Sequence, residues 1–230
     1  MQSSEGRRGP GRPAGAAPQP VASAARMLAD DAAAMWPEVT GHPFVLAAGD
    51  GSLDPAAFDR WIAADYVYVI GCRRLVAGLI ALAPDEGQRE VLTASLPAVQ
   101  AELDLFRGHA TRRGIDLDAE PGPTTVGYTA YTQAVLYDGY PVALTAFYGI
   151  EKAYYDAWSA VRAQAADSSP YWPFIDNWSS PRFGRWVADL AGLVDRSLPN
   201  GPTPDALRAF RRVARFEARF WDAVYHAETW

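Results

Sequence analysis

The chain has 230 residues, of which 49% are hydrophobic and 12% aromatic, so it can bury a sizeable core and the body of the chain is not intrinsically disordered. Its net charge is −6 and its arginines are spread along the chain, which argues against a nucleic-acid-binding protein. No apolar run reaches the roughly 20 residues of a membrane span, and the single cysteine, Cys72, excludes an internal disulfide and suits a reducing cytoplasm.

The first twenty residues are mainly Gly, Pro, Ala, Ser and Arg, without an apolar period. We expect residues 1–20 to be a disordered tail that lacks the apolar stretch of a signal peptide. No linker or repeat interrupts the remainder, so residues 21–230 are expected to form a single domain.

Periodic apolar residues between Gly, Pro and Asp breakers predict an all-α bundle, because no segment shows sustained strict alternation. Asp54 before Pro55 is a typical helix start, and Gly114 is a typical helix stop. Residues 42–45 are read as irregular and residues 49–52 as a turn. The predicted helices are 21–39, with Pro37 breaking it near its end, 55–82, 88–112, 124–138, 141–166, 181–197 and 204–228.

Glu151 lies at the centre of an apolar face of the helix predicted over residues 141–166. Its neighbours three, four and seven positions away are Leu144, Phe147, Tyr148, Tyr154, Tyr155 and Trp158. The same spacing around Asp156 gives Gly, Lys, Ser and Ala residues, which is typical of a solvated acid. Glu151 is therefore not expected to be a surface residue.

Two more acids have apolar or aromatic residues at these same spacings. Asp65 has Phe58, Trp61, Ile62, Tyr68, Val69 and Cys72 around it, and Glu217 has Phe210, Val213, Ala214, Phe220, Trp221 and Val224. Asp222 has polar neighbours instead. Burying an unpaired ionised acid is costly, so such acids pair, bind a ligand or shift their pKa upward.

Two interpretations of these acids stay open at this point. Each acid can be a structural residue that is hydrogen-bonded within the core, or all three can face one cavity. The surplus of aromatic residues has the same two interpretations, as core packing or as a pocket that stacks a flat ring. The aromatic residues concerned are Tyr68, Tyr128, Tyr131, Tyr154, Tyr155 and Trp178.

Five short motifs, spread over roughly residues 25–230, resemble those of the TenA/thiaminase II family in order and spacing. They are His42–Val45; Phe58, Trp61 and Asp65–Tyr68; Tyr128 and Thr129 followed by Gly139; Ile175–Trp178; and Phe216, Glu217 and Phe220–Asp222. The resemblance implies an all-helical protein of the haem-oxygenase-like architecture that acts on thiamin-related pyrimidines and assembles as a homodimer or homotetramer.

The resemblance also implies roles for single residues. Asp65 and Tyr68 match the family's acid and tyrosine that bind the aminopyrimidine, and Tyr128 matches a pocket tyrosine. Glu217 matches the family's acid/base glutamate. Trp178 stands where the family has a tyrosine.

Glu151 stands where the better-known branch has its nucleophilic cysteine. The chain therefore resembles the branch that lacks this cysteine, which is associated with salvage of amino- and formylamino-pyrimidines. Asp65 would engage the aminopyrimidine edge in a two-point contact, while Glu151 and Glu217 would divide the acid and base roles in hydrolysis. We expect a small-molecule substrate, no cofactor and no metal.

Other interpretations stay open. Cys72 shares a helix face with Asp65, so it is either a relocated thiol nucleophile or a small buried hydrophobe. Haem or di-iron oxidase chemistry, known from the wider fold, needs histidine ligands, but His42, His109 and His226 are scattered in the sequence. The loss of the cysteine also fits a non-catalytic protein that binds pyrimidine or thiamin, whereas Glu217 argues for an enzyme.

Overall fold

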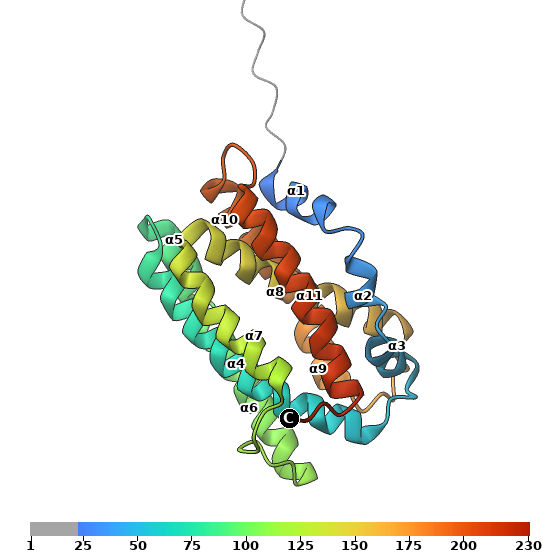
Figure 1. The fold of residues 1–230 in the computed structure, drawn as a ribbon. Coiled ribbons are helices and arrows are strands. Elements are labelled where there is room, and N and C mark those ends of the chain that lie inside the picture. Colours follow the sequence, from blue (N-terminus) through green and yellow to red (C-terminus); the bar gives the residue numbers. More distant parts are fainter. Residues whose placement is uncertain (1–22) are drawn as a thin grey trace, which may run out of the picture.

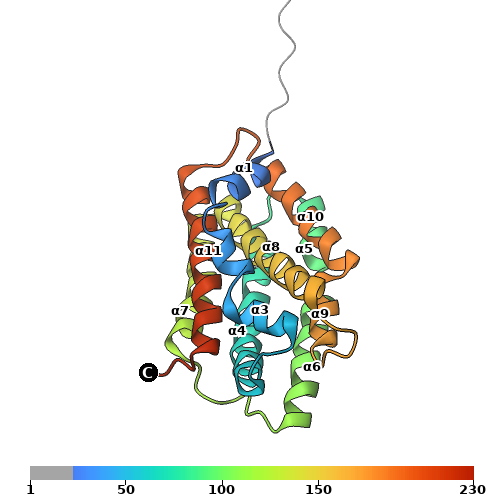
Figure 2. The same cartoon turned by 90° about the vertical axis from the view of Figure 1, so that its right-hand side faces the viewer.

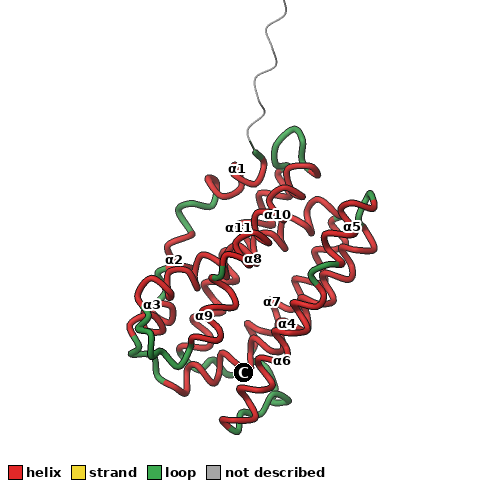
Figure 3. Tube along the Cα trace, turned by 180° about the vertical axis from the view of Figure 1, so that it is seen from behind, coloured by secondary structure: helices red, strands yellow, loops and turns green. Residues whose placement is uncertain are grey.

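A computed structural model describes residues 23–230, so the predicted tail at 1–20 lies outside the described residues. This part of the chain is all-α and contains no strand, as predicted (Figures 1 and 3). The helices are α1 Ala24–Asp31, α2 Trp36–Thr40, α3 Pro43–Asp50, α4 Pro55–Leu82, α5 Glu86–Thr93, α6 Leu96–Arg113, α7 Pro123–Ala134, α8 Tyr140–Gln164, α9 Trp172–Ser179, α10 Pro181–Ser197 and α11 Pro204–Tyr225, with a 3₁₀ turn, η1, at Val135–Asp138.

The predicted helix ends are confirmed where the sequence has a clear cap. The Asp54 side chain accepts a hydrogen bond from the backbone N–H of Ala56 and caps α4, with Pro55 in the first turn. Gly114 ends α6 with a φ of 71°, in the left-handed region that favours glycine.

Two predicted helices are each two helices in the structure. The segment predicted as 21–39 is divided into α1 and α2, and the segment predicted as 88–112 into α5 and α6. Pro37 and Pro97 lie in the first turns of the second helices. A proline ring clashes with the carbonyl four residues earlier and has no N–H to donate, so neither helix continues through its proline.

Two short helices, α3 and α9, were not predicted. His42 caps α3 through its ring, because Nδ1 accepts a hydrogen bond from the backbone N–H of Phe44 at 3.1 Å. Both helices have eight residues, too few for a clear period.

Helix α8 runs through the middle of the bundle (Figure 2) and packs against α3, α9, α10 and α11. Helix α4 packs against α5, α6, α7 and α11. The two long helices thus carry their apolar faces into one continuous core. No helix within residues 23–230 is long and apolar enough to cross a membrane.

A glycine lets α4 and α7 approach closely. A Cβ atom at Gly71 would lie only 2.6 Å from Cγ2 of Thr129 on α7, a separation that real side chains do not adopt. One turn before Gly71, the rings of Tyr68 and Tyr128 meet with their centroids 4.4 Å apart. The close approach of these helices therefore brings together two of the predicted site residues.

Candidate active site

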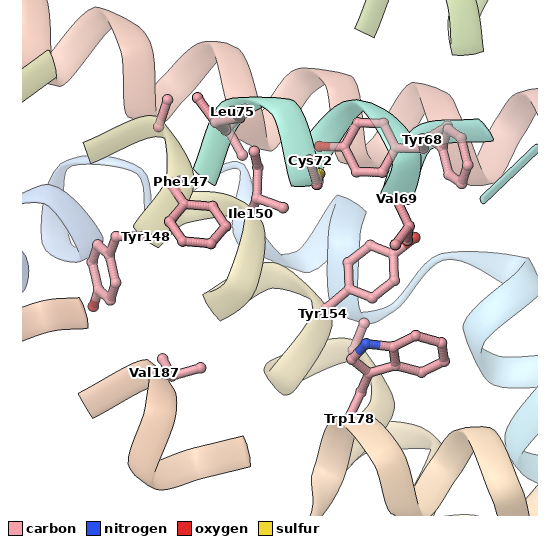
Figure 4. Close-up of a cluster of buried hydrophobic side chains, with 14 of the residues drawn as sticks. Tyr68, Val69, Cys72, Leu75, Phe147, Tyr148, Ile150, Tyr154, Trp178 and Val187 are labelled. Atoms are coloured by element: carbon pink, nitrogen blue, oxygen red, sulfur yellow. The ribbon is translucent and has the colours of Figure 1, made fainter. Parts of the chain in front are cut away.

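A small cavity of about 30 Å³ lies among α4, α6, α8, α9 and α10. Asp65, Tyr68, Glu102, Glu151, Tyr154 and Trp178 are among its lining residues. Figure 4 shows Tyr68 and Cys72 on α4, Tyr154 on α8 and Trp178 on α9 gathered around one region of the core. A groove of about 680 Å³ adjoins the cavity between α6, α9 and α10.

Asp65 is fully buried and lines the cavity. The hydroxyl of Tyr154 donates a hydrogen bond to Oδ1 at 2.5 Å, whereas Oδ2 has no partner among the described residues. Burial raises the pKa of this carboxyl well above its usual value; Tyr154 opposes the shift and the charge of Glu102 adds to it. A buried oxygen without a partner is the kind of atom that a ligand or water satisfies.

Glu217 is also fully buried, but it is not among the residues lining the cavity. It is linked to the cavity through Tyr128, whose hydroxyl donates to Oε1 at 2.5 Å and whose ring contacts Tyr68. Burial raises the pKa of Glu217 well above its usual value, and the charges of Asp65 and Glu151 raise it further. The other carboxylate oxygen, Oε2, has no partner among the described residues.

Glu151 is half-buried and borders both the cavity and the groove. The indole N–H of Trp186 donates to its Oε2 at 3.0 Å. Loss of hydration raises the pKa of Glu151 to about 8; the charge of Glu102 contributes to the rise and the hydrogen bond from Trp186 opposes it. Glu151 is therefore not a surface residue, as expected.

Glu102 on α6 was not predicted, although it borders both spaces as Glu151 does. Nδ2 of Asn177 donates to its Oε1 at 3.2 Å. Loss of hydration raises the pKa of Glu102 to about 7. Hydrogen bonds from Asn177 and Trp178 oppose this rise. The sequence carried part of the signal: Val99, Leu105 and Phe106 lie three or four positions from Glu102, although Ser95 and His109, seven positions away, are polar.

The aromatic wall of the cavity includes Trp178. Its ring stacks on Trp158 with centroids 5.5 Å apart and meets the ring of Tyr154 edge-on at 5.6 Å. Cys72 also lines the cavity, but burial and the charge of Glu151 raise the pKa of its thiol well above the usual value. This environment favours the thiol over the nucleophilic thiolate.

The histidines lie elsewhere. Nε2 of His42 is 3.0 Å from Asp222 near the surface, and the His109 ring packs edge-on against Phe58 and Phe174. Within residues 23–230, no three His, Cys, Asp or Glu side chains are grouped so that they could hold a metal ion.

The structure thus places four of the predicted site residues, Asp65, Tyr68, Glu151 and Trp178, on one cavity. Tyr128 and Glu217 form a hydrogen-bonded pair immediately behind Tyr68. Glu151 and Glu217 are close enough for the charge of one to raise the pKa of the other, yet their strongest charged neighbours are Glu102 and Asp65, respectively.

The chain is similar to known proteins over most of its length. The TENA/THI-4/PQQC family model matches residues 29–227. The chain is 29% identical over 219 residues to an aminopyrimidine aminohydrolase of Halalkalibacterium halodurans, covering 90% of this chain and 98% of the relative. It is 25% identical over 194 residues to a Glycine max protein named "Probable bifunctional TENA-E protein", covering 80% of this chain and 85% of the relative.

Solved structures agree as well. A TenA homologue from Pyrococcus furiosus superposes with a TM-score of 0.82 at 30% identity, covering 87% of this chain and 98% of the homologue. A TenA homologue from P. horikoshii superposes with a TM-score of 0.78 at 20% identity, covering 87% and 97%, and shows the fold alone. The expected haem-oxygenase-like fold is confirmed.

Proposed function

We propose that this chain, which belongs to the TENA/THI-4/PQQC family, is a hydrolase of thiamin-related aminopyrimidines. Its reaction would convert 4-amino-5-aminomethyl-2-methylpyrimidine and water into the 5-hydroxymethyl pyrimidine and ammonia, in thiamin salvage. The observation that carries the proposal is the buried Asp65, whose Oδ2 has no partner among the described residues and which lines an aromatic cavity bordered by Glu151. The likeness to an aminopyrimidine aminohydrolase over nearly the whole chain supports it.

Asp65 would bind the edge of the pyrimidine. An aminopyrimidine offers an exocyclic N–H next to a ring nitrogen, and one carboxyl group can contact both. The raised pKa of Asp65 suits this contact, because a carboxyl that can carry a proton can also give one to the ring nitrogen. Tyr68, whose buried hydroxyl has no partner among the described residues, and Trp178 would enclose the ring.

Glu151 and Glu217 would carry out the hydrolysis. The C–N bond to the side-arm amine breaks, a C–O bond to the oxygen of water forms, and the nitrogen leaves as ammonia. Glu151, at the border of the cavity and the groove, would act as general base or as the attacking carboxylate. The pKa of Glu217 is raised mainly by its burial, and this residue would supply the proton.

The direct test is to incubate the protein with the aminomethyl pyrimidine, its formylaminomethyl derivative and thiamin, and to identify the products by mass. The hydroxymethyl pyrimidine with ammonia is the expected product of the first substrate. Glu151→Gln serves as the control for contaminating activity. Tight binding without product would favour the non-catalytic binding protein, and neither binding nor product would contradict the proposed function.

A further inference from the structure

The cavity and the groove meet at a narrow border that we call the neck. Five residues line both spaces: Val99, Glu102, Phe147, Glu151 and Phe183. Three of these are apolar, and the remaining two are carboxylates facing the same passage from α6 and α8. A ligand whose ring occupies the cavity can extend a side arm through the neck, past Glu102 and Glu151.

Neither neck carboxylate has a cationic partner. Glu102 is held by the amide of Asn177 and Glu151 by the indole of Trp186, which are both uncharged donors. Among the described residues, no Lys, Arg or His lines the cavity, and neither acid takes part in an ion pair. The neck therefore holds two carboxylates that form no ion pair with a cation of residues 23–230, although Arg182 and Arg185 line the adjoining groove.

A second observation points to a ligand at the same place. Oδ2 of Asp65 and the hydroxyl of Tyr68 belong to side chains that are 0% and 2% exposed, line the cavity and have no hydrogen-bond partner among the described residues. Buried polar atoms are nearly always satisfied in proteins. A polar molecule seated in the cavity would satisfy both atoms while its substituent points to the neck.

We propose that Glu102 and Glu151 together bind a primary ammonium group on the side arm of the substrate, and that Glu102 is the residue selecting this cation over a neutral substituent. This inference rests on the proposed function and names its substrate class as pyrimidines with a cationic side arm. It also gives a reason for product release, because the hydroxymethyl product has no charge to hold it at the neck.

The protonation of the pair supports this assignment. The pKa of Glu102 is raised to about 7 and that of Glu151 to about 8, so near neutral pH the two acids together carry about one proton and one negative charge. One ammonium group neutralises the pair. The other titratable or charged groups lining the two spaces are Asp65, Tyr68, Cys72 and Tyr154 on the cavity side and Asp176, Arg182, Arg185 and Asp189 on the groove side.

The test compares two ligands of nearly equal size, the aminomethyl and the hydroxymethyl pyrimidine. Their dissociation constants are measured at pH 7 by rapid-mixing tryptophan fluorescence, before turnover, for the wild type and Glu102→Gln. Glutamine keeps the oxygen that accepts from Asn177. Asp104→Asn is the matched control, because it removes a charge from the same helix at an exposed side chain that lines neither space.

Glu102→Gln should weaken binding of the amine about tenfold, which lies at the lower end of the effect of a hydrogen bond to a charged group. Its affinity for the alcohol should stay within about twofold, and Asp104→Asn should change neither. Equal losses for both ligands, or no loss for the amine, would overturn the role of Glu102. If the wild type binds neither pyrimidine, the proposed function fails instead.

Discussion

Replacing Asp65 by asparagine should weaken ligand binding and stabilise the protein at the same time. The variant keeps an oxygen that accepts from Tyr154 but loses the charge and one contact to the aminopyrimidine. A hydrogen bond to a charged group contributes about 1.5–3 kcal/mol. Because about 1.4 kcal/mol corresponds to a tenfold change, the dissociation constant should rise roughly 10- to 150-fold.

The effect on stability follows from the raised pKa of Asp65. An acid whose pKa is higher in the folded than in the unfolded state loses stability as the pH rises from the unfolded value, about 3.9, to the folded one. Asparagine does not titrate and avoids this loss. The free energy of unfolding of the variant should therefore exceed that of the wild type above about pH 4, by about 1.4 kcal/mol for each unit of the pKa shift.

Calorimetry with the hydroxymethyl pyrimidine measures the first effect, and urea unfolding of the ligand-free protein at several pH values measures the second. Asp104→Asn, exposed on α6, is the control for loss of an acid elsewhere. A purely structural Asp65 would give the opposite pattern, with a less stable variant and an unchanged affinity. That result would remove Asp65 from the site.

Four further outcomes are expected. Glu151→Gln and Glu217→Gln should each abolish turnover with little effect on affinity for the uncharged hydroxymethyl pyrimidine; a near-normal rate per folded molecule, measured by product mass, would mean that the glutamate is structural. If Glu151 is the base, kcat/KM should rise with pH through about 8, and Glu102→Gln should move this rise to lower pH because it removes a neighbouring negative charge; an unmoved profile contradicts this pairing. Thiamin should be a poor substrate and Cys72→Ser should retain activity; rapid thiazole release would make this thiol the first residue to examine. Activity should survive exhaustive dialysis against chelator, and a loss restored by iron or zinc would contradict the metal-free mechanism.

The fold class follows from the sequence because apolar periodicity and caps are local properties. The break associated with Pro37 was predicted, whereas the division at Pro97, where a single residue decides between one helix and two, was missed. Both prolines fit the first turn of a new helix as well as they end an old one. The 3₁₀ turn at Val135–Asp138 was likewise predicted as part of a longer helix.

Burial of the acids was predicted from the residues three, four and seven positions away on the same helix. This prediction was correct where those neighbours determine the burial. It identified Asp65 and Glu217, which are fully buried. For Asp156, predicted to be solvated, it was only partly right: the side chain is 24% exposed and pairs with Lys152, but Trp36 from α2 also donates to this carboxylate at 2.7 Å. The contact comes from α2, 120 residues earlier in the sequence, so the periodicity of α8 does not reveal it. Glu102 was missed because Ser95 and His109, seven positions away, are polar, and because its approach to Glu151 depends on how α6 packs near α8.

The small volume of the inner cavity has a consequence for the speed of binding. About 30 Å³ holds roughly one or two water molecules, whereas the adjoining groove of about 680 Å³ is of the size that small ligands occupy. A pyrimidine ring does not fit this inner space as it stands, so we expect it to bind in the groove first and to enter when side chains that line the cavity move. Association then has two steps, and its observed rate levels off at high ligand concentration at the frequency of that side-chain motion instead of following diffusion.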